Sequence, residues 1–568
     1  MKTLNLHVDY IEWEGLKKAL KSMDDLPEGE TKKTKVDEAL VVMTAVEKAD
    51  SLEMMDQYLE NIRTIASQVG AKNVVLYPYA HLSNDLGKPA LAIEFLKTAE
   101  EKLKEEGVSV FRAPFGYYKA FELRVKGHPL SELARSIVIE GNEEAEVELT
   151  DKERKRMLKE VSKSKLDTSK LAENDHRIIG RKMDLWSFNA AAPGMVFWHN
   201  KGMFIKNALI EYWRQLHRKG GYEEISTPQI MDRKLWEVSG HWAKYKDNMF
   251  TSKYEKRDFA VKPMNCPGGM MVYKTTPKSY KDLPLRSGEL GVVHRQELSG
   301  VLSGLFRVIQ FTQDDAHVFC TEEQLEVEIG RIIDLINEAF ATFDLTVDHV
   351  ELSTRPEKRI GREELWDLAE ESLEKVLKHR EMVYTVNEGD GAFYGPKIDF
   401  HLKDSLGRTW QCSTIQLDMA LPERFDLEYS AEDGSMKRPI MLHRVVYGSI
   451  ERFIGIITEQ YNGKFPLWIN PNQVKVMTMN ENVKGYAKEV YDKLFDAGFQ
   501  VELDARDEKI GKKVREASIS RFAYMLTLGD AESEENVVAV KKNGEKEIEK
   551  MSVDAFIEKM KVEIASRK

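Results

Sequence analysis

The chain contains 568 residues, of which 42% are hydrophobic and 32% charged, so it is long enough for several domains with buried cores. No run of about 18 apolar residues occurs, so no membrane-spanning helix is predicted. The N-terminus lacks the pattern of a signal peptide. The net charge of −11 argues against nucleic-acid binding through bulk positive charge, although local basic patches remain compatible with it. Three scattered cysteines, Cys266, Cys320 and Cys412, indicate a reducing, cytoplasmic location rather than a disulfide framework.

Residues 1–138 have the pattern of a mixed α/β domain. Apolar spacing predicts three strands, at Leu4–Tyr10, Val41–Val46 and Asn73–Tyr79. It also predicts two helices, at Met54–Val69 and Pro89–Glu106. Residues 139–175 then mix Lys and Glu with few aromatics, which predicts a charged helical linker that is simply solvated.

Residues 176–468 form the largest and most aromatic block, and their most informative stretch is Arg307–His317. In a strand, side chains alternate between two faces. One face would then carry Arg307, Ile309, Phe311, Gln313, Asp315 and His317. Besides the isoleucine, these are a cation, an aromatic ring, an amide, a carboxylate and an imidazole. A structural strand would place Val and Ile on its inner face instead, so the pattern predicts a functional site. A polar outer face is the alternative, but Phe311 fits it poorly.

A second strand, Gly291–Glu297, precedes this stretch and is joined to it by the loop Ser299–Leu305, which predicts an antiparallel hairpin. Arg295 and Glu297 share one face of it. A buried arginine requires an anion, and its planar guanidinium suits a carboxylate or a phosphate.

A helix is predicted to begin at Gly448-Ser449 and to carry Arg452 in its first turns, where a helix N-terminus attracts anions. A surface ion pair of Arg452 with Glu451 or Glu459 is the alternative. The chain has no glycine-rich phosphate loop. If the chain binds a nucleotide such as ATP, arginines and the surface of a sheet must therefore hold it.

The remaining residues, 469–568, alternate between strand and helix patterns, which predicts a small α/β domain. The strands are predicted at Gln473–Met479, Gln500–Asp504, Tyr524–Leu528 and Val537–Lys541, and the helices at Ala487–Ala497 and Ile510–Arg521.

Three of these features resemble the motifs of class II aminoacyl-tRNA synthetases. Ile225–Pro228 matches motif 1, the hairpin with Arg295 matches motif 2, and Gly448–Arg452 matches motif 3. More narrowly, the chain resembles threonyl-tRNA synthetases in four runs, Asp175–Arg177, Ala192–Asn200, Met264–Gly268 and Gln313–His317. The resemblance implies an antiparallel-sheet catalytic core and a homodimer built partly on motif 1.

The resemblance also implies that Cys266, His317 and His443 hold one Zn²⁺ ion, although their spacing alone would not predict a metal site. Three protein ligands leave one position open, which in this family takes the amino and hydroxyl groups of threonine. Such a site would reject valine, which an apolar pocket barely distinguishes from threonine. Asp315 would accept a hydrogen bond from the hydroxyl. The other implied amino-acid contacts are Gln313, Tyr394, Gln416, Cys412 and Arg295.

For ATP and its Mg²⁺, the resemblance implies that Arg295 bridges the α-phosphate and the amino-acid carboxylate, that Arg452 holds the γ-phosphate and that Phe311 stacks on adenine. Further implied ATP contacts are Glu297, Arg307, Lys397, Gln411 and Ser449, and His241 is implied to lie near the tRNA 3′ end. The chain departs from the family at Gly269, where a histidine is usual, and at Ile309-Gln310, where many relatives have Arg-Gly.

The N-terminal runs Tyr77–Ser83, Ala113–Phe121 and Gly127–Glu132 resemble the archaeal editing domain, which is similar in fold to D-aminoacyl-tRNA deacylase. Serine lacks only one methyl group of threonine, worth about 1–3 kcal/mol of discrimination, so hydrolysis of seryl-tRNA at a second site is expected. The residues implied to line that site are His81, Tyr118, Lys119 and Glu132.

The C-terminal domain resembles the anticodon-binding domain of class II synthetases, with Asp507, Glu532 and Lys541 at the positions implied to contact anticodon bases. Asp507 stands where asparagine is commoner, and the helix Lys509–Arg515 could equally be a solvated face.

The sequence and its resemblance thus predict a multidomain α+β and α/β enzyme with domains at 1–138, 176–468 and 469–568. It is expected to attach L-threonine to tRNA(Thr) with ATP and to hydrolyse mischarged seryl-tRNA(Thr). Two alternatives stay open. One is a catalytically silent paralogue, which the presence of Arg295 and Arg452 disfavours. The other is a free-standing deacylase, which the intact Cys266, His317 and His443 set disfavours.

Overall fold

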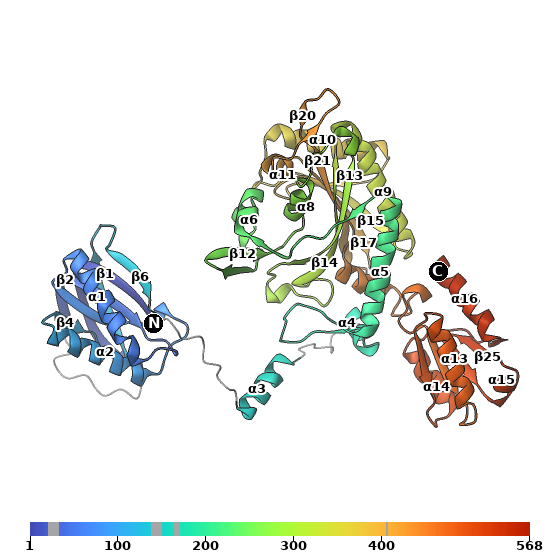
Figure 1. The fold of residues 1–568 in the computed structure, drawn as a ribbon, viewed down its shortest axis with the longest axis horizontal. Helices are drawn as coiled ribbons and strands as arrows, with labels where there is room; N and C mark the ends of the chain where they lie inside the picture. The colour runs from blue at the N-terminus through green and yellow to red at the C-terminus, as the bar shows by residue number, and fades with distance from the viewer. Residues whose placement is uncertain (21–32, 138–149, 164–170, 405–406, 568) are drawn as a thin grey trace. The chain divides into compact units, whose positions relative to one another are not determined.

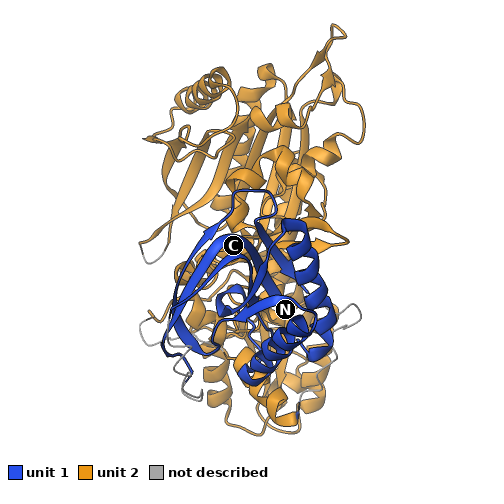
Figure 2. Cartoon of the chain, turned by 90° about the vertical axis from the view of Figure 1, so that its left-hand side faces the viewer, with its two compact units in different colours: residues 1–150 blue, residues 151–568 orange. Residues whose placement is uncertain are grey.

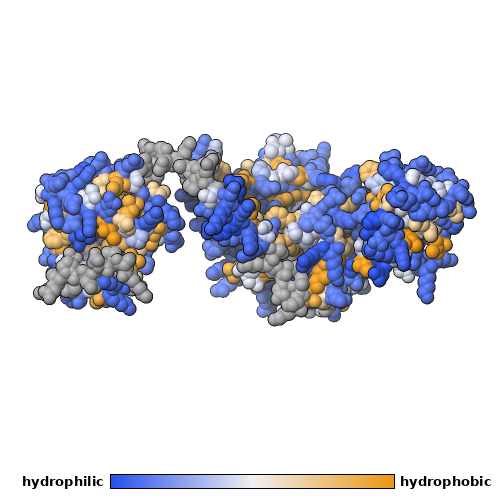
Figure 3. Space-filling model, turned by 90° about the horizontal axis from the view of Figure 1, so that it is seen from below, coloured by the Kyte–Doolittle hydropathy of each residue, from blue (hydrophilic) through white to orange (hydrophobic). Residues whose placement is uncertain are grey.

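The computed structural model describes residues 1–20, 33–137, 150–163, 171–404 and 407–567. The chain forms two compact units, Met1–Thr150 and Asp151–Lys568, which are coloured separately in Figure 2. Within the described ranges, no helix is long and apolar enough to cross a membrane. The face of the molecule in Figure 3 is largely hydrophilic, with hydrophobic residues in small groups.

Unit 1 is built on one mixed sheet with the order β4-β3-β2-β1-β5, to which β6 is added along β1. Its strands are β1 (Lys2–Lys18), β2 (Thr34–Ala45), β3 (Asn73–Pro78), β4 (Ser109–Arg112), β5 (Tyr117–Val125) and β6 (Glu132–Ser136), and its helices are η1 (Leu52–Met54), α1 (Met55–Val69), η2 (Ala80–Leu82) and α2 (Pro89–Glu105). Helices α1 and α2 pack on one face (Figure 1) over a core that contains Leu40 and Val42. The other face buries Val41 and Met43, so this segment is apolar at every position, as in a strand covered on both sides.

The predicted elements of unit 1 are present, but β1 is much longer than Leu4–Tyr10. It runs from Lys2 to Lys18 because three strands pair along it, and register shifts after Val8 and Gly15 let it bend. Strands β4, β5 and β6 were not predicted. Of the predicted linker, Asp151–Val161 is a helix, α3, whose residues are all exposed; residues 138–149 and 164–170 lie outside the described residues.

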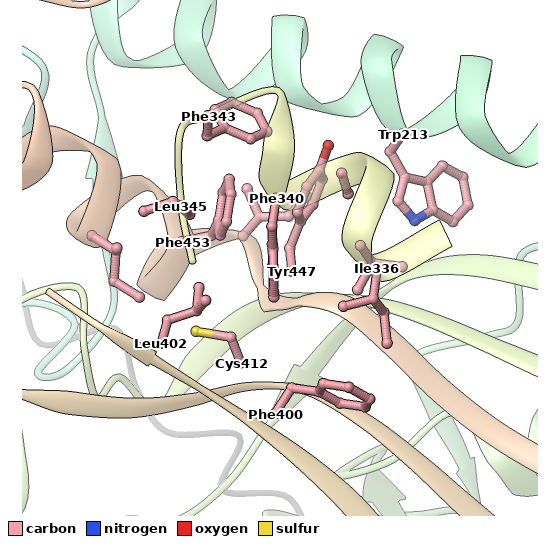
Figure 4. Packing of buried hydrophobic residues seen from close by; sticks show 14 of the residues in the cluster. Trp213, Ile336, Phe340, Phe343, Leu345, Phe400, Leu402, Cys412, Tyr447 and Phe453 are labelled. Carbon is pink, nitrogen blue, oxygen red and sulfur yellow. The ribbon is translucent and has the colours of Figure 1, made fainter. Parts of the chain in front are cut away.

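Unit 2 contains an eight-stranded sheet with the order β16-β15-β17-β18-β21-β14-β13-β9, antiparallel except at its two edge pairs. Its strands are β9 (Glu223–Glu224), β13 (Leu285–His294), β14 (Gln310–Cys320), β15 (Val347–Ser353), β16 (Thr385–Asn387), β17 (Lys397–Lys403), β18 (Thr409–Asp418) and β21 (Ile440–Ser449). Helices α9 (Leu325–Ala341), α10 (Glu363–His379) and α12 (Ile450–Gln460) pack on this sheet. Figure 4 shows the resulting core, in which Phe340 and Phe343 meet Tyr447 and Phe453.

The remaining elements before the C-terminal domain are short apart from α5. They are α4 (His176–Lys182), β7 (Trp186–Ser187), β8 (Phe197–Trp198), α5 (Asn200–Lys219), β10 (Ile230–Asp232), α6 (Arg233–Ser239), α7 (His241–Lys244), η3 (Lys246–Asn248), β11 (Thr251–Tyr254), β12 (Arg257–Val261), α8 (Cys266–Tyr273), η4 (Tyr280–Asp282), η5 (Ser299–Val301), η6 (Glu322–Gln324), α11 (Ala420–Arg424), β19 (Tyr429–Ser430), β20 (Met436–Lys437) and η7 (Leu467–Ile469).

The C-terminal residues form a separate five-stranded sheet with the order β23-β22-β24-β25-β26. Its elements are β22 (Val474–Thr478), α13 (Lys484–Asp496), β23 (Val501–Asp504), α14 (Ile510–Ile519), β24 (Tyr524–Leu528), α15 (Asp530–Glu534), β25 (Val538–Lys542), β26 (Glu549–Met551) and α16 (Val553–Ser566). The predicted alternation is confirmed, with ends displaced by a few residues; α15, β26 and α16 were not predicted.

The predicted strand Arg307–His317 begins three residues late, at Gln310. Upstream of it the chain bends, because the Ile309 N–H donates to the Gly194 carbonyl at 2.7 Å. Gly194 has φ +71°, and a Cβ there would lie 2.9 Å from the Ile309 side chain. The predicted alternation therefore applies from Phe311 to His317, and not to Arg307 and Ile309.

A buried ion pair fixes the segment that contains the motif 1 proline. The Lys262 ammonium donates to Glu289 Oε1 at 2.8 Å and to Thr227 Oγ1 at 3.0 Å, and the Thr227 N–H donates to the same Glu289 oxygen at 2.8 Å. The side chains of Lys262 and Glu289 are 1% and 2% exposed. Each buried charge is therefore stabilised by the other in place of water.

We expect Lys262→Met to destabilise unit 2 by about 3–5 kcal/mol, because it leaves the Glu289 carboxylate buried without its counter-ion. Urea unfolding followed by tryptophan fluorescence measures this, since eight of the nine tryptophans lie in residues 176–468. The control is Lys219→Met, which removes the exposed Lys219–Glu338 pair and should cost about 1 kcal/mol or less. Equal effects of the two substitutions would contradict the prediction.

Candidate active site

Cys266, His317 and His443 come together in unit 2 from three elements. Cys266 is the first residue of α8, and His317 and His443 are directly paired across β14 and β21. One ligand atom of each lies within 4.8 Å of the others. All three residues are buried, and the two imidazole rings meet edge to face with centroids 4.9 Å apart.

The contacts of this cluster suit a metal ion. Both ring nitrogens of His317 are buried and have no hydrogen-bond partner among the described residues, and such orphaned groups require an explanation. His443 is oriented by Asp418, whose Oδ2 lies 2.8 Å from Nε2 and leaves Nδ1 for a metal. Burial lowers the pKa of His317 to about 4, so its imidazole is neutral at pH 7. Two nitrogens and a sulfur form a donor set that Zn²⁺ prefers.

A cavity of about 160 Å³ opens beside the cluster. Five predicted amino-acid contacts line it, namely Arg295, Gln313, Asp315, Tyr394 and Gln416. Asp315 is held by Asn265, whose Nδ2 donates to Oδ2 at 3.2 Å. Asn265 can approach only because Gly291 has no side chain: a Cβ there would lie 2.1 Å from the Asn265 oxygen. Cys412 was also predicted here, but the structure places its thiol in the hydrophobic core (Figure 4).

A second cavity, of about 390 Å³, adjoins the first, since both are lined by Arg295, Gln313, Thr414 and Val445. The predicted ATP contacts Glu297, Arg307, Phe311, Gln411, Ser449 and Arg452 line it. Arg307 is paired with Glu297 at 2.8 Å. Arg295 and Arg452 form no ion pair with any described residue: Arg295 donates to the Pro263 carbonyl, and Arg452 donates to the Phe306 and Gln411 carbonyls. Two guanidinium groups without acidic partners make this cavity attractive to anions.

Lys397 does not line either cavity but is connected to the second one through Asp399. The buried Asp399 carboxylate accepts hydrogen bonds from Lys397 Nζ at 2.7 Å, Gln411 Nε2 at 2.6 Å and Thr414 Oγ1 at 2.7 Å. Asp399 therefore fixes two predicted ATP residues. Sequence reasoning missed it, although an aspartate between two apolar strand residues, Ile398 and Phe400, is a detectable signal.

Asp314 positions the third motif. Strand β21 contains extra residues opposite Asp314, between the pairs Gln313–Ser449 and Asp315–Val445. The Asp314 carboxylate fills this bulge and accepts hydrogen bonds from the N–H groups of Val446, Tyr447 and Gly448 at 2.9–3.0 Å. Sequence reasoning missed this role. Adjacent residues of a strand point to opposite faces, so of the neighbours Asp314 and Asp315 one carboxylate must lie on the buried face, which is a detectable signal.

The predicted helix start in the third motif is confirmed: α12 begins at Ile450, and Ser449 is its N-cap, with Oγ accepting from the Arg452 N–H at 3.1 Å. Ser449 thereby holds Arg452 in the first turn. The alternative of a surface Arg452 is wrong, because its guanidinium is held by two backbone carbonyls next to the second cavity.

His241, predicted near the tRNA 3′ end, is completely buried. Its ring nitrogens lie 2.8 Å from Ser239 Oγ and 3.0 Å from Met264 Sδ, and burial lowers its pKa to about 3. The ring packs against Phe393 and Tyr394, so in this structure it supports the wall of the first cavity rather than its opening.

Unit 1 contains its own cavity, of about 510 Å³, lined by His81, Tyr118 and Lys119 together with Tyr77 and Phe121. The Lys119 ammonium donates to the Pro114 carbonyl at 3.0 Å and lies 4.9 Å from the Tyr77 ring centroid. Burial lowers its pKa to about 8. Glu132, predicted with these residues, does not line the cavity; it begins β6 and pairs with Leu6 on β1.

The three predicted anticodon residues are spread over the C-terminal sheet. Asp507 and Glu532 follow the carboxyl ends of β23 and β24, which are both parallel to β22. Lys541 instead pairs with Met525 near the start of β24. Glu532 caps the Gly529 N–H and pairs with Lys550 at 2.9 Å, whereas Asp507 is exposed.

Comparison with known families assigns three stretches of the chain to described domains. Residues 1–137 match the archaea-specific editing domain of threonyl-tRNA synthetase, residues 249–461 the class II tRNA synthetase core domain (G, H, P, S and T), and residues 473–563 an anticodon-binding domain. The multidomain α/β architecture with a class II core is thus confirmed.

The chain is 55% identical over 393 residues to a threonine–tRNA ligase of Desulforamulus reducens, and 54% identical over 396 residues to that of Carboxydothermus hydrogenoformans. These alignments cover 69% and 70% of the chain, and the chain spans 62% of the length of each relative.

Two solved structures are also similar. The RNA-binding domain of threonyl-tRNA synthetase from Cryptosporidium parvum has a TM-score of 0.67 and 39% identity, over 68% of this chain and 98% of that one. A threonyl-tRNA synthetase from Aeropyrum pernix has a TM-score of 0.59 and 27% identity, over 69% and 97%.

We expect Asp418→Asn to weaken metal binding at Cys266, His317 and His443 by about 10–100-fold, because a neutral amide orients and polarises His443 less well. Titration with Co²⁺ measures this selectively, since only a site with a cysteine gives thiolate-to-cobalt charge-transfer absorption. The control is Asp426→Asn, which affects an exposed pair with Arg438. Unchanged cobalt affinity in Asp418→Asn would remove Asp418 from the site.

Proposed function

The chain belongs to the threonyl-tRNA synthetase family, and from this premise we propose that it attaches L-threonine to tRNA(Thr) with ATP and hydrolyses seryl-tRNA(Thr) at a second site. One observation carries the proposal: Arg295 lines both adjoining cavities, one beside a Cys/His cluster and the other beside unpaired Arg452. This arrangement accommodates an amino acid and a nucleotide whose reacting groups meet at Arg295.

In the first step, a threonine carboxylate oxygen attacks the α-phosphorus of ATP and pyrophosphate leaves. Arg295 neutralises the carboxylate and the α-phosphate, and Arg452 holds the γ-phosphate, so both charges are fixed before the reaction. The Phe311 ring, 5.1 Å from the Arg295 guanidinium, offers a surface for adenine. Mg²⁺ would enter with ATP. The tRNA 3′ ribose then attacks the carbonyl carbon of the adenylate, and AMP leaves.

The selection of threonine follows from the floor of the first cavity. Cys266, His317 and His443 would hold Zn²⁺, which supplies a Lewis acid for the amino and hydroxyl groups of the substrate. Asp315 accepts a hydrogen bond from the hydroxyl, and Asn265 keeps its carboxylate in place. Valine has no hydroxyl group, so it can neither donate a hydrogen bond to Asp315 nor offer an oxygen to the zinc ion. Serine keeps the hydroxyl and lacks only the methyl group of threonine, so it can do both.

Unit 1 supports the editing step. Its cavity is separate from the first two, as required of a site that hydrolyses the product after transfer. Lys119 provides a cation for the developing negative charge of the ester, while His81 and Tyr118 offer polar groups to the ester and water. Glu132, outside the cavity, has no role in this proposal.

Further parts of the proposal concern assembly and tRNA binding. The domains are 1–138 (editing), 139–175 (linker), 176–468 (catalysis) and 469–568 (anticodon binding). In the last domain, Asp507 and Glu532 follow the carboxyl ends of strands β23 and β24. The homodimer would form along the sheet edge at β9, which presents backbone groups to a partner strand. The three free cysteines fit a cytoplasmic enzyme.

We expect zinc-dependent ATP–pyrophosphate exchange with threonine. Exchange with serine should be weaker by about 10–200-fold, the value of one methyl group, and exchange with valine weaker by about 10⁴–10⁵-fold, because the buried polar groups would stay unpaired. Removal of zinc by a chelator should abolish exchange, and added zinc should restore it. The absence of exchange with any of the three amino acids in the folded, zinc-loaded chain would favour the silent paralogue.

We expect Lys119→Met to reduce hydrolysis of seryl-tRNA(Thr) by about 100-fold or more, since one charge-stabilising group is lost. The Lys119 side chain carries a positive charge below its pKa of about 8 and is neutral above it. The enzymatic rate, corrected for spontaneous hydrolysis, should therefore fall as the pH rises through 8. Lys102→Met, which removes an exposed lysine of the same unit that pairs with Asp56 and does not line the cavity, should change neither property. A rate that rises through pH 8 would instead indicate a general base.

A further inference from the structure

A second cluster of metal-ligating side chains lies toward the opposite edge of the eight-stranded sheet from β9. His349 and Glu351 lie two residues apart on β15, and His401 lies directly opposite His349 on β17. The three side chains therefore share one face of the sheet. One ligand atom of each lies within 4.8 Å of the others. Strand β18 separates β17 from β21, which carries His443, so this cluster is distinct from the first.

The distances within the cluster fit the ligands of one shared metal ion better than they fit hydrogen bonds. Nε2 of His349 lies 3.5 Å from Oε1 of Glu351, and Nε2 of His401 lies 3.4 Å from Oε2. Both distances exceed the roughly 2.7–3.2 Å of a hydrogen bond. Zinc bonds of about 2.0–2.1 Å in tetrahedral geometry separate two ligands by about 3.4 Å, which matches.

The surrounding contacts orient the ligands. Nδ1 of His349 lies 2.8 Å from Asp348 Oδ2, which leaves Nε2 directed at Glu351. This carboxylate–histidine arrangement is usual around bound metals. Asn387 Nδ2 donates to Glu351 Oε2 at 3.1 Å and holds the carboxylate. His401 Nε2 is buried and has no hydrogen-bond partner among the described residues, so this nitrogen is available to a metal ion.

The imidazole rings of His349 and His401 are stacked, with centroids 4.3 Å apart and planes 12° from parallel. Nε2 of each ring lies within 3.5 Å of a Glu351 carboxylate oxygen, so both nitrogens face the same carboxylate.

A third group of similar composition, Asp175, His176 and Glu459, shows what a satisfied cluster looks like. Both nitrogens of His176 are used: Nδ1 lies 2.7 Å from Glu459, and Nε2 accepts from the Leu305 N–H at 3.0 Å. Its carboxylates are paired with Arg177 and Arg408. No ligand atom is left for a metal, in contrast to the cluster on β15 and β17.

We propose that His349, Glu351 and His401 form a second site for a divalent transition-metal ion, with Zn²⁺ as the ion that fits, and that this ion ties β15 to β17. Two imidazoles and one carboxylate leave a fourth position for water. The site contains no sulfur, which distinguishes it spectroscopically from the cluster with Cys266. It stands independently of the proposed catalytic function.

The test is the zinc content of the full chain. After chelation, reloading with Zn²⁺ and removal of loosely bound metal, elemental analysis should give two zinc ions per chain. His401→Gln and Glu351→Gln should each give one, and the matched control His379→Gln, an exposed histidine paired with Glu326, should still give two. Co²⁺ bound to Cys266→Ser should show ligand-field bands without thiolate charge transfer, and these bands should disappear in Cys266→Ser combined with His401→Gln.

One zinc ion per chain in the unsubstituted protein, with the thiolate band intact, would overturn the proposal. Two ions that persist in both His401→Gln and Glu351→Gln would also overturn it, as would a second ion lost equally in His379→Gln. Circular dichroism of each variant establishes that it is folded, and two ligand substitutions guard against an effect on folding by either one. None of these readouts requires aminoacylation, so failure here leaves the proposed function unaffected.

Discussion

The pairing of β14 with β21 is the constraint on which the catalytic unit depends. It places His317 directly opposite His443, so two nitrogen ligands from segments far apart in sequence meet without any loop. Three residues earlier on β14, at Asp314, the same pairing is interrupted by the bulge that the Asp314 carboxylate fills. The bulge redirects the end of β21 so that Ser449 caps α12 and Arg452 lies beside the second cavity. One strand pair therefore sets the distance between His317 and His443, the proposed metal ligands, and Arg452, the proposed phosphate contact.

Buried charge is used in two opposite ways in this unit. Lys262 and Glu289 are paired with each other, and both form hydrogen bonds with Thr227. Arg295 and Arg452 are held by backbone carbonyls, which fix their positions without neutralising them. A cation that is ordered but lacks an acidic partner remains available to a carboxylate or phosphate, and its ordering cost is already met in folding. This difference separates the structural charges from those of the site.

In the proposed function, the two units address a single problem of discrimination between amino acids. A cavity with Asp315 and three metal ligands can reject an amino acid without a hydroxyl, but it cannot strongly reject a smaller one that keeps it. The separate cavity of unit 1, with its depressed Lys119 pKa, is suited to act on a product that has already left the first site. An editing domain attached to a class II core is consistent with this division of work.

Sequence alone determined the features that depend on local pattern and on the family resemblance: the mixed α/β domains, the polar face Phe311–His317, the helix that begins at Ser449 and most of the residues that line the cavities. It could not determine the roles of Asp314, Asp399 and Asp418, because each acts on groups from other strands. It also placed Glu132, Lys397 and His241 in sites that their side chains do not line, and Cys412 in the amino-acid pocket although its thiol is in the core, since a motif specifies a position on the chain but not the direction of a side chain. The pairing of His349 with His401, 52 residues apart, exists only in the folded sheet, because strand register brings together residues that no spacing rule connects.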